Sequence, residues 1–115
     1  MTTTVYGIAG CDTVKKARDW LAERGVAYIF HDYKKQGTDP AQIARWVGVA
    51  GWEKLLNRAG TTFRKLADVD KSGLDAAKAI NVMTANPSAI RRPIVEYPGG
   101  LLVGFSPDEW ETALC

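Results

Sequence analysis

The sequence is poor in cysteine and histidine and has no long apolar run. Its two cysteines, Cys11 and Cys115, are too few for a disulfide framework. The single histidine, His31, has no cysteine or histidine near it, so we expect it to be structural and expect no metal site. Apolar runs fall far short of the 18 or so residues that span a bilayer, and no basic region precedes the first apolar stretch. We therefore expect a cytoplasmic protein with no membrane partner.

The chain also lacks a strong charge imbalance. Its formal net charge is +2, which by itself does not suggest a nucleic-acid partner. With 115 residues, 46% of them hydrophobic and 24% charged, it has the composition of one globular domain, and we expect a monomer. A domain of this size can bury enough surface to fold without disulfides or a structural metal. All four tryptophans fall at helical apolar positions and are expected in the core: Trp20, Trp46, Trp52 and Trp110.

Apolar periodicity and turn residues predict an α/β chain in three parts. A β-α-β unit spans 3–33, with strands at 3–8 and 26–33, and a helical insertion spans about 39–90. A β-β-α unit at 91–115 contains a hairpin. Strands joined through a helix normally lie parallel and hairpin strands antiparallel, so we predict a mixed four-stranded sheet with helices on its faces. This order is a thioredoxin-like plan with a helical insertion, in one domain over 1–115.

Capping residues predict where the helices begin. Asp12 or Thr13 can cap the helix that follows the first strand. Asp39, followed by proline, and Ser72 are expected to cap helices of the insertion, in which glycines at 48 and 51 break the first helix. Ser106, with glutamate three residues later, predicts a capping box for the last helix.

Cys11 precedes the first predicted helix, and two interpretations are open there. The unpaired N–H groups and the positive end of a helix stabilise a thiolate, and such sites lower a cysteine pKa from about 8.5 into the range of roughly 3.5–7.5. Lys15 and Arg18, on one face of the helix, add positive charge. Alternatively, Cys11 is a small apolar residue that fills a core. Its neighbours Gly10 and Asp12 suit an accessible loop, so we interpret Cys11 as reactive.

The sequence has no C-x-x-C motif. Val14 stands three residues after Cys11, where a dithiol oxidoreductase has its resolving cysteine. The site is therefore predicted to use one thiol, whose disulfide partner is another molecule or the distant Cys115. We expect Cys115 to be an exposed terminal residue, although a role as resolving cysteine stays open.

Five segments together resemble the arsenate reductase (ArsC) family, and within it the YffB-like branch, to which the Spx proteins are related. They are GCDTVKKA, HDYKK, LLNRAGTTFRKL, IRRPIVEY and LVGFSPDEW. The resemblance covers nearly the whole chain and implies a thioredoxin-like fold with a helical insertion. It also implies that Cys11 is the nucleophile, that Arg92 lies beside its thiolate, and that the bond before Pro93 is cis.

Departures from the family pattern bear on the substrate. Arsenate reductases that this chain resembles hold the oxyanion with three arginines. Here the first position is Asn57, with Arg58 beside it; the second is Arg92; and the third falls on Gly104 or Phe105. A doubly charged oxyanion needs several charge-assisted hydrogen bonds, so the loss of two arginines should weaken arsenate binding.

The resemblance to the YffB-like branch therefore implies a glutathione-dependent thiol/disulfide reductase. Its expected partners are glutathione, as a co-substrate rather than a bound cofactor, and an oxidised small-molecule or protein thiol. Two alternatives are a glutathione-linked arsenate reductase and a non-enzymatic, Spx-like regulator that binds RNA polymerase. The expected site residues are catalytic Cys11 and Arg92, together with Thr13, Lys15, Arg58 and Pro93 for substrate or glutathione. Thr13 would donate its hydroxyl or cap the helix, Arg58 would contact a carboxylate, and Lys15 would raise the local potential.

Overall fold

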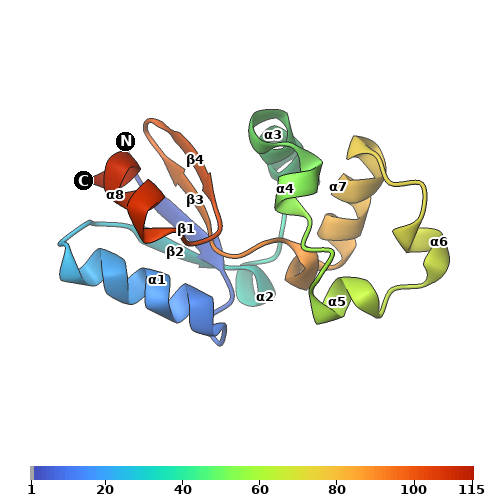
Figure 1. Cartoon of the computed structure of the whole chain (residues 1–115), viewed down its shortest axis with the longest axis horizontal. Helices are drawn as coiled ribbons and strands as arrows, with labels where there is room; N and C mark the ends of the chain where they lie inside the picture. Colours follow the sequence, from blue (N-terminus) through green and yellow to red (C-terminus); the bar gives the residue numbers. More distant parts are fainter. Residues whose placement is uncertain (1) are drawn as a thin grey trace. The chain divides into compact units, whose positions relative to one another are not determined.

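The computed structural model describes residues 2–115, which divide into two compact units (Figure 1). The first unit consists of the chain up to Gln36 together with Arg92–Cys115, and the second is Gly37–Arg91. The two ends of the sequence thus fold together, and the second unit is an insertion between them. The assignment of both units to one domain stays a prediction.

The first unit is built on a mixed four-stranded sheet, as predicted. Its elements are β1 (Thr4–Gly7), α1 (Asp12–Glu23), β2 (Ile29–Asp32), α2 (Tyr33–Gln36), β3 (Ile94–Tyr97), β4 (Gly100–Val103) and α8 (Pro107–Leu114). The strand order is β2-β1-β3-β4, with β1 parallel to β2 and antiparallel to β3, which in turn is antiparallel to β4 (Figure 1). This arrangement confirms the α/β, thioredoxin-like plan.

The first two strands are shorter than predicted. The N–H of Val26 donates to the carbonyl oxygen of Leu21, so the chain is still turning out of α1 at a position where the sequence predicts a strand. Pairing with β1 begins at Ile29, whose N–H donates to the carbonyl oxygen of Thr3. Gly25, at φ 68°, makes the left-handed turn that ends the helix.

One core lies between the sheet and the two long helices of this unit. Its buried members are Val5, Ala17, Trp20, Leu21, Val95, Leu102 and Trp110. The Trp20 and Trp110 rings meet edge to face at 5.9 Å, and the Trp110 indole N–H donates to the Gly104 carbonyl oxygen at 3.1 Å. Trp20, Trp46 and Trp110 are buried as predicted, whereas Trp52 is only half-buried, so its assignment to the core was wrong.

Among its described residues, the second unit contains helices, turns and an isolated antiparallel β-bridge between Leu56 and Ile90. The helices are α3 (Pro40–Ala50), α4 (Trp52–Leu55), α5 (Thr61–Arg64), α6 (Asp68–Lys71), α7 (Ala76–Ala85) and the 3-10 helix η1 (Pro87–Ala89). The Asp39 carboxylate accepts a hydrogen bond from the Ala41 N–H at 2.9 Å, which confirms the predicted cap. The predicted break at Gly48 is wrong, because α3 continues to Ala50 and ends at Gly51, whose φ is 88°.

Two other predicted caps are wrong in detail. Ser72 ends α6, where its hydroxyl donates to the carbonyl oxygen of Asp68, and α7 is capped instead by Asp75, which accepts from the Lys78 N–H at 2.8 Å. Ser106 is the N-cap of α8, as predicted, but within residues 2–115 its hydroxyl accepts no capping hydrogen bond, so the capping box does not form. Over the same residues, no helix has the length and apolar character needed to cross a bilayer.

Candidate active site

Cys11 is the N-cap of α1, at the end of the loop that leaves β1. Its N–H donates to the Ile8 carbonyl oxygen at 3.0 Å, and its own carbonyl oxygen accepts from the Lys15 N–H at 3.0 Å. This second bond is the first of the helix, so Asp12 and Thr13 are already helical. The prediction that either of them caps the helix is therefore wrong. The half-buried Cys11 side chain thus stands at the N–H groups of the first turn.

The pKa of the Cys11 thiol is lowered from its ordinary value. Partial burial acts in the opposite direction and raises the pKa, but hydrogen bonding to the thiolate outweighs it. The donors are the backbone N–H of Val14, the side chain of Arg92 and the backbone N–H of Thr13, and the charge of Arg92 adds to their effect. At neutral pH a larger fraction of Cys11 is therefore thiolate than for a cysteine with the ordinary pKa. The thiolate is the nucleophilic form of cysteine.

Arg92 and Pro93 reach this site from the other end of the sequence. They immediately precede β3, and the peptide bond between them is cis, as the family resemblance implies. Pro93 is buried, and its carbonyl oxygen accepts a hydrogen bond from the Gly104 N–H at 2.8 Å, which ties this segment to the end of the β3–β4 hairpin. The half-buried Arg92 is thereby held where its side chain hydrogen-bonds Cys11.

Close packing between β1 and α1 fixes the position of Cys11. A Cβ atom on Gly7, the last residue of β1, would lie 2.8 Å from a methyl carbon of Val14. Val14 is fully buried and occupies the position that a resolving cysteine would have in a C-x-x-C motif. The first turn of α1 therefore lies directly against a glycine of β1, through the apolar side chain of Val14.

Asp32 binds the loop that carries Cys11, a contact that sequence reasoning missed. It ends β2 and is only 6% exposed, yet its carboxylate accepts the Ala9 N–H at 3.2 Å from the loop that carries Cys11. Its other oxygen accepts the Lys34 N–H at 2.8 Å. Burial alone would raise the pKa of Asp32, but these backbone donors lower it. The available signal was an aspartate between a strand and two lysines in HDYKK, a pattern typical of a local turn.

The remaining predicted site residues are distributed over both units. Thr13 and Lys15 are exposed on the first turns of α1, and their contacts with a substrate stay predictions. Arg58 belongs to the Gly37–Arg91 unit, where it is exposed and lies over the Trp52 ring, 5.5 Å from its centroid. Its predicted contact with a carboxylate stays a prediction.

His31 and Cys115 are the other side chains of the described residues that were considered for chemistry. The centroid of the His31 ring lies 4.9 Å from that of Tyr6 and 6.4 Å from that of Tyr33, in keeping with a structural role. Cys115 is exposed at the end of α8. Within residues 2–115, no group of three or more histidine, cysteine and acidic side chains is arranged to hold a metal ion.

Comparisons with known proteins agree with this architecture. The model of the ArsC family matches residues 6–113. The solved structure of the protein named YFFB (PA3664) is 55% identical and superposes with a TM-score of 0.97, covering 99% of this chain and 100% of that one. An arsenate reductase (ArsC) related protein from Brucella melitensis is 52% identical, with a TM-score of 0.78, and 97% of this chain and 93% of that one are covered.

A more distant relative has a regulatory name. The global transcriptional regulator Spx of Streptococcus mutans is 28% identical over 108 residues, which are 92% of this chain and 78% of the regulator. The similarity thus extends to a protein named as related to arsenate reductase and to a named transcriptional regulator, and the choice between these functions depends on the chemistry of the site.

Proposed function

Because the chain belongs to the ArsC family, we propose that it is a glutathione-dependent thiol/disulfide reductase that acts through Cys11. The observation that carries this proposal is the lowered pKa of Cys11, for which Val14, Thr13 and Arg92 supply the hydrogen bonds. A purely structural cysteine would gain nothing from an arginine directed at its sulfur. The reducing cytoplasm that we propose as its compartment would keep both cysteines as thiols.

The proposed reaction is two successive thiol–disulfide exchanges. The Cys11 thiolate attacks the glutathione sulfur of a mixed disulfide between glutathione and a substrate thiol, the substrate leaves as a thiolate, and a Cys11–glutathione disulfide forms. A second glutathione thiolate then attacks that disulfide and releases oxidised glutathione and the Cys11 thiolate. Overall, the substrate sulfur gains one electron and the sulfur of the incoming glutathione loses one, while the glutathione sulfur of the mixed disulfide passes into oxidised glutathione at the same oxidation level.

The residues around the sulfur have distinct roles in this scheme. The N–H groups of Val14 and Thr13 and the guanidinium of Arg92 stabilise the Cys11 thiolate both as the attacking group and as the leaving group. No second thiol of the chain is needed, because glutathione resolves the intermediate. Val14 keeps the chemistry monothiol, since its buried methyl groups occupy the place of an internal resolving thiol.

Arsenate reduction is the second candidate, and the names of related structures favour it. Two of the three arginines that resembling arsenate reductases use are replaced here, by Asn57 and by Gly104 or Phe105. Gly104 has φ 77° and carries the carbonyl group that accepts from the Trp110 indole. An arginine there would strain the backbone, so this end of the hairpin is suited to holding α8 rather than to binding an oxyanion.

The experiment is a coupled assay with glutathione, glutathione reductase and NADPH. The purified protein is given either the mixed disulfide of cysteine and glutathione or arsenate, and NADPH oxidation is measured. We expect turnover of the mixed disulfide that disappears in Cys11→Ser and persists in Cys115→Ser. Cys11-dependent turnover of arsenate alone would favour the second candidate. Inertness toward both substrates, with stoichiometric binding to RNA polymerase in ultracentrifugation, would favour a regulator like its Spx relatives.

A further inference from the structure

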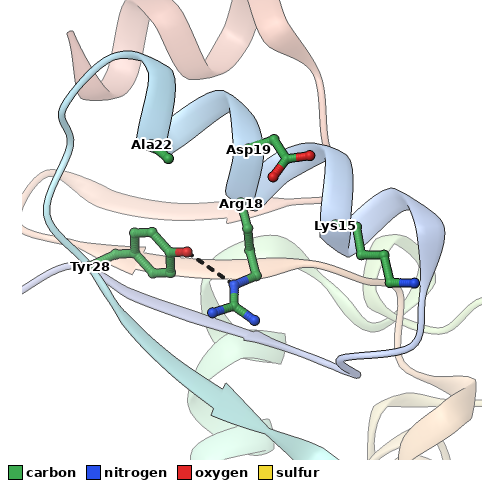
Figure 2. A pocket seen from close by; sticks show the side chains of 5 residues that line it. All are labelled: Lys15, Arg18, Asp19, Ala22 and Tyr28. Atoms are coloured by element: carbon green, nitrogen blue, oxygen red, sulfur yellow. Dashed lines mark hydrogen bonds between the residues drawn. The ribbon is translucent and has the colours of Figure 1, made fainter.

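The outer face of α1 carries a pocket that the proposed chemistry leaves unexplained. It has a volume of about 230 Å³ and is lined by Lys15, Arg18, Asp19, Ala22 and Tyr28 (Figure 2). Four of these residues come from α1, and Tyr28 comes from the segment that leads into β2. All of them belong to the first unit, which also carries Cys11.

The pocket follows the face of α1 that begins at Cys11. At 3.6 residues per turn, Lys15, Arg18 and Ala22 are rotated by at most about 40° from Cys11. The opposite face is buried in the core through residues such as Ala17 and Trp20. A molecule bonded to the Cys11 sulfur therefore has a continuous polar surface in front of it along the helix.

Arg18 is held in place before any ligand binds. Its Nε donates a hydrogen bond to the Tyr28 hydroxyl at 3.0 Å, and its guanidinium carbon lies 4.1 Å from the centroid of the Phe30 ring. In Figure 2 the guanidinium reaches Tyr28 through Nε, while its two terminal nitrogens are directed away from that hydroxyl. A half-buried, stacked arginine loses little side-chain entropy when an anion binds to those nitrogens.

The charges of the pocket match an amino-acid head group. Lys15 and Arg18 can hold a carboxylate, and Asp19 can accept from an ammonium group. Among residues 2–115, no ion pair joins Asp19 to either of these cations. The three charged groups are therefore available to a zwitterion, which carries both a carboxylate and an ammonium group on one carbon.

We propose that this pocket binds the γ-glutamyl end of glutathione while the glutathione sulfur is bonded to Cys11. The proposal rests on the function proposed above and adds the recognition of the γ-glutamyl group by Lys15, Arg18 and Asp19. Glutathione has such a zwitterionic head at its γ-glutamyl end, whereas its glycine end has only a carboxylate.

The distances allow this binding mode. Arg18 follows Cys11 by seven residues, which is about 10 Å along the helix axis at 1.5 Å per residue, and Lys15 is nearer, at about 6 Å. A disulfide separates its two Cα atoms by about 5.5–6 Å, and the γ-linked glutamyl residue adds more than the roughly 3.5 Å of an α-linked residue, because its Cβ and Cγ stand between the peptide bond and the head group. The glutamyl head therefore reaches the region between Lys15 and Arg18 without any movement of the helix.

The test compares disulfides that differ only in the ends of glutathione. In a Cys115→Ser background, the second-order rate of Cys11 modification is measured by mass spectrometry with oxidised glutathione, bis-γ-glutamylcystine and cystinyl-bisglycine. We expect the first two to react faster than the third when each rate is divided by the rate of the same disulfide with a small free thiol, because the free ammonium group of cystinyl-bisglycine makes its thiol a better leaving group. Arg18→Met and Lys15→Met should each slow those two by about three- to tenfold and leave the third within about twofold.

Lys16→Met is the matched control, because Lys16 is exposed but rotated by about 140° from Cys11. If Lys16→Met slows the γ-glutamyl disulfides as much as Arg18→Met does, general electrostatic attraction explains the preference and the pocket is not its cause. Asp19→Asn, at an exposed position, should slow the same two disulfides, so the proposal does not depend on a variant of the half-buried Arg18.

Failure of this proposal is distinguishable from failure of the proposed function. Equal rates with all three disulfides, each relative to its rate with a small free thiol, would refute the γ-glutamyl pocket and leave Cys11 a disulfide-exchanging nucleophile. If Cys11 reacts with none of them, the proposed function fails, and the pocket proposal that rests on it fails as well. A preference that Arg18→Met and Lys15→Met leave intact would also overturn the assignment of the pocket.

Discussion

The backbone N–H of Ala9 donates a hydrogen bond to Oδ2 of Asp32 at 3.2 Å, across 23 positions of the sequence. Ala9 lies two residues before Cys11, and Asp32 ends the strand that pairs with β1, where Gly7 is its register partner. One carboxylate thus fixes the loop that carries the nucleophile to the adjacent strand. Loss of this bond should affect both the stability of the chain and the reactivity of Cys11.

Asp32→Asn tests this connection through stability. An asparagine presents an N–H₂ group to one of the backbone donors, so we expect a loss of about 1–3 kcal/mol in the free energy of unfolding at pH 7. The folded-state pKa of Asp32 is lowered, so its carboxylate stabilises the fold above the unfolded pKa of about 4 and this contribution is lost as the pH falls through the folded pKa. The difference between variant and wild type in urea unfolding should therefore shrink below pH 4.

The same variant separates positioning from simple structural support. If Asp32 positions the loop, the pH profile of Cys11 alkylation shifts to higher pH in Asp32→Asn, while the exposed control Asp108→Asn leaves it unchanged. A destabilised Asp32→Asn protein with an unaltered alkylation profile would contradict the positioning role.

Arg92→Met tests the electrostatic origin of the reactivity of Cys11. Because the Arg92 hydrogen bond and charge lower the pKa of Cys11, their removal should raise it toward the ordinary value. Each unit of increase lowers the thiolate fraction about tenfold at a pH below the pKa. The rate of iodoacetamide modification at pH 6, in a Cys115→Ser background, should fall accordingly.

A matched substitution controls for the loss of positive charge alone. Arg91 is exposed and its Nε donates to the Lys54 carbonyl oxygen, in the other unit of the chain from Cys11. Arg91→Met should therefore leave the alkylation profile of Cys11 in place. An equal shift in both variants would show that net charge, rather than the Arg92 hydrogen bond, governs the pKa.

The parts of the fold that depend on local patterns were predictable from the sequence. Asp39 followed by Pro40 fixes the start of α3 through a hydrogen bond from the Ala41 N–H in the first turn, and Gly25 ends α1 by its positive φ. The parallel and antiparallel pairs of the sheet follow from the order of strands and helices. The position of Cys11 at the start of a helix was also predictable, because it too depends on a local sequence pattern.

Features that depend on contacts between distant residues were not predictable. Ser72 and Asp75 are both good capping residues within four positions, and only the folded chain selects Asp75. Asp32 resembles an ordinary turn residue until the fold brings Ala9 to it. The proximity of Arg92 to Cys11 came from the family resemblance rather than from periodicity, because 81 positions separate them and no local rule relates them.

Val14→Cys tests why the site has one thiol. The substitution creates a C-x-x-C motif with the new sulfur in a buried position on the first turn of α1. We expect oxidation by diamide to form a disulfide with Cys11 and thereby to block modification of Cys11 by oxidised glutathione. Mass spectrometry of the diamide-treated protein measures both products, and persistent glutathione modification of Cys11 would show that the position does not serve as a resolving one.

Gly7→Ala tests whether the close packing of Gly7 against Val14 determines the position of Cys11. The added methyl group would lie 2.8 Å from a Val14 methyl carbon, so either the side chain or α1 must move, and we expect a cost of about 1–3 kcal/mol in the free energy of unfolding. Val14→Ala alone should also be destabilising, because it leaves a cavity in a fully buried position.

The double variant decides whether the two residues act through one contact. If the new methyl group of Gly7→Ala fills the space that Val14→Ala vacates, the combined loss of unfolding free energy is smaller than the sum of the separate losses. In Gly7→Ala alone, a displaced α1 moves its first-turn N–H groups away from Cys11, so the alkylation profile should shift to higher pH and return toward wild type in the double variant. Additive losses with an unshifted profile would show instead that the strand and helix relax independently and that Gly7 has no part in placing Cys11.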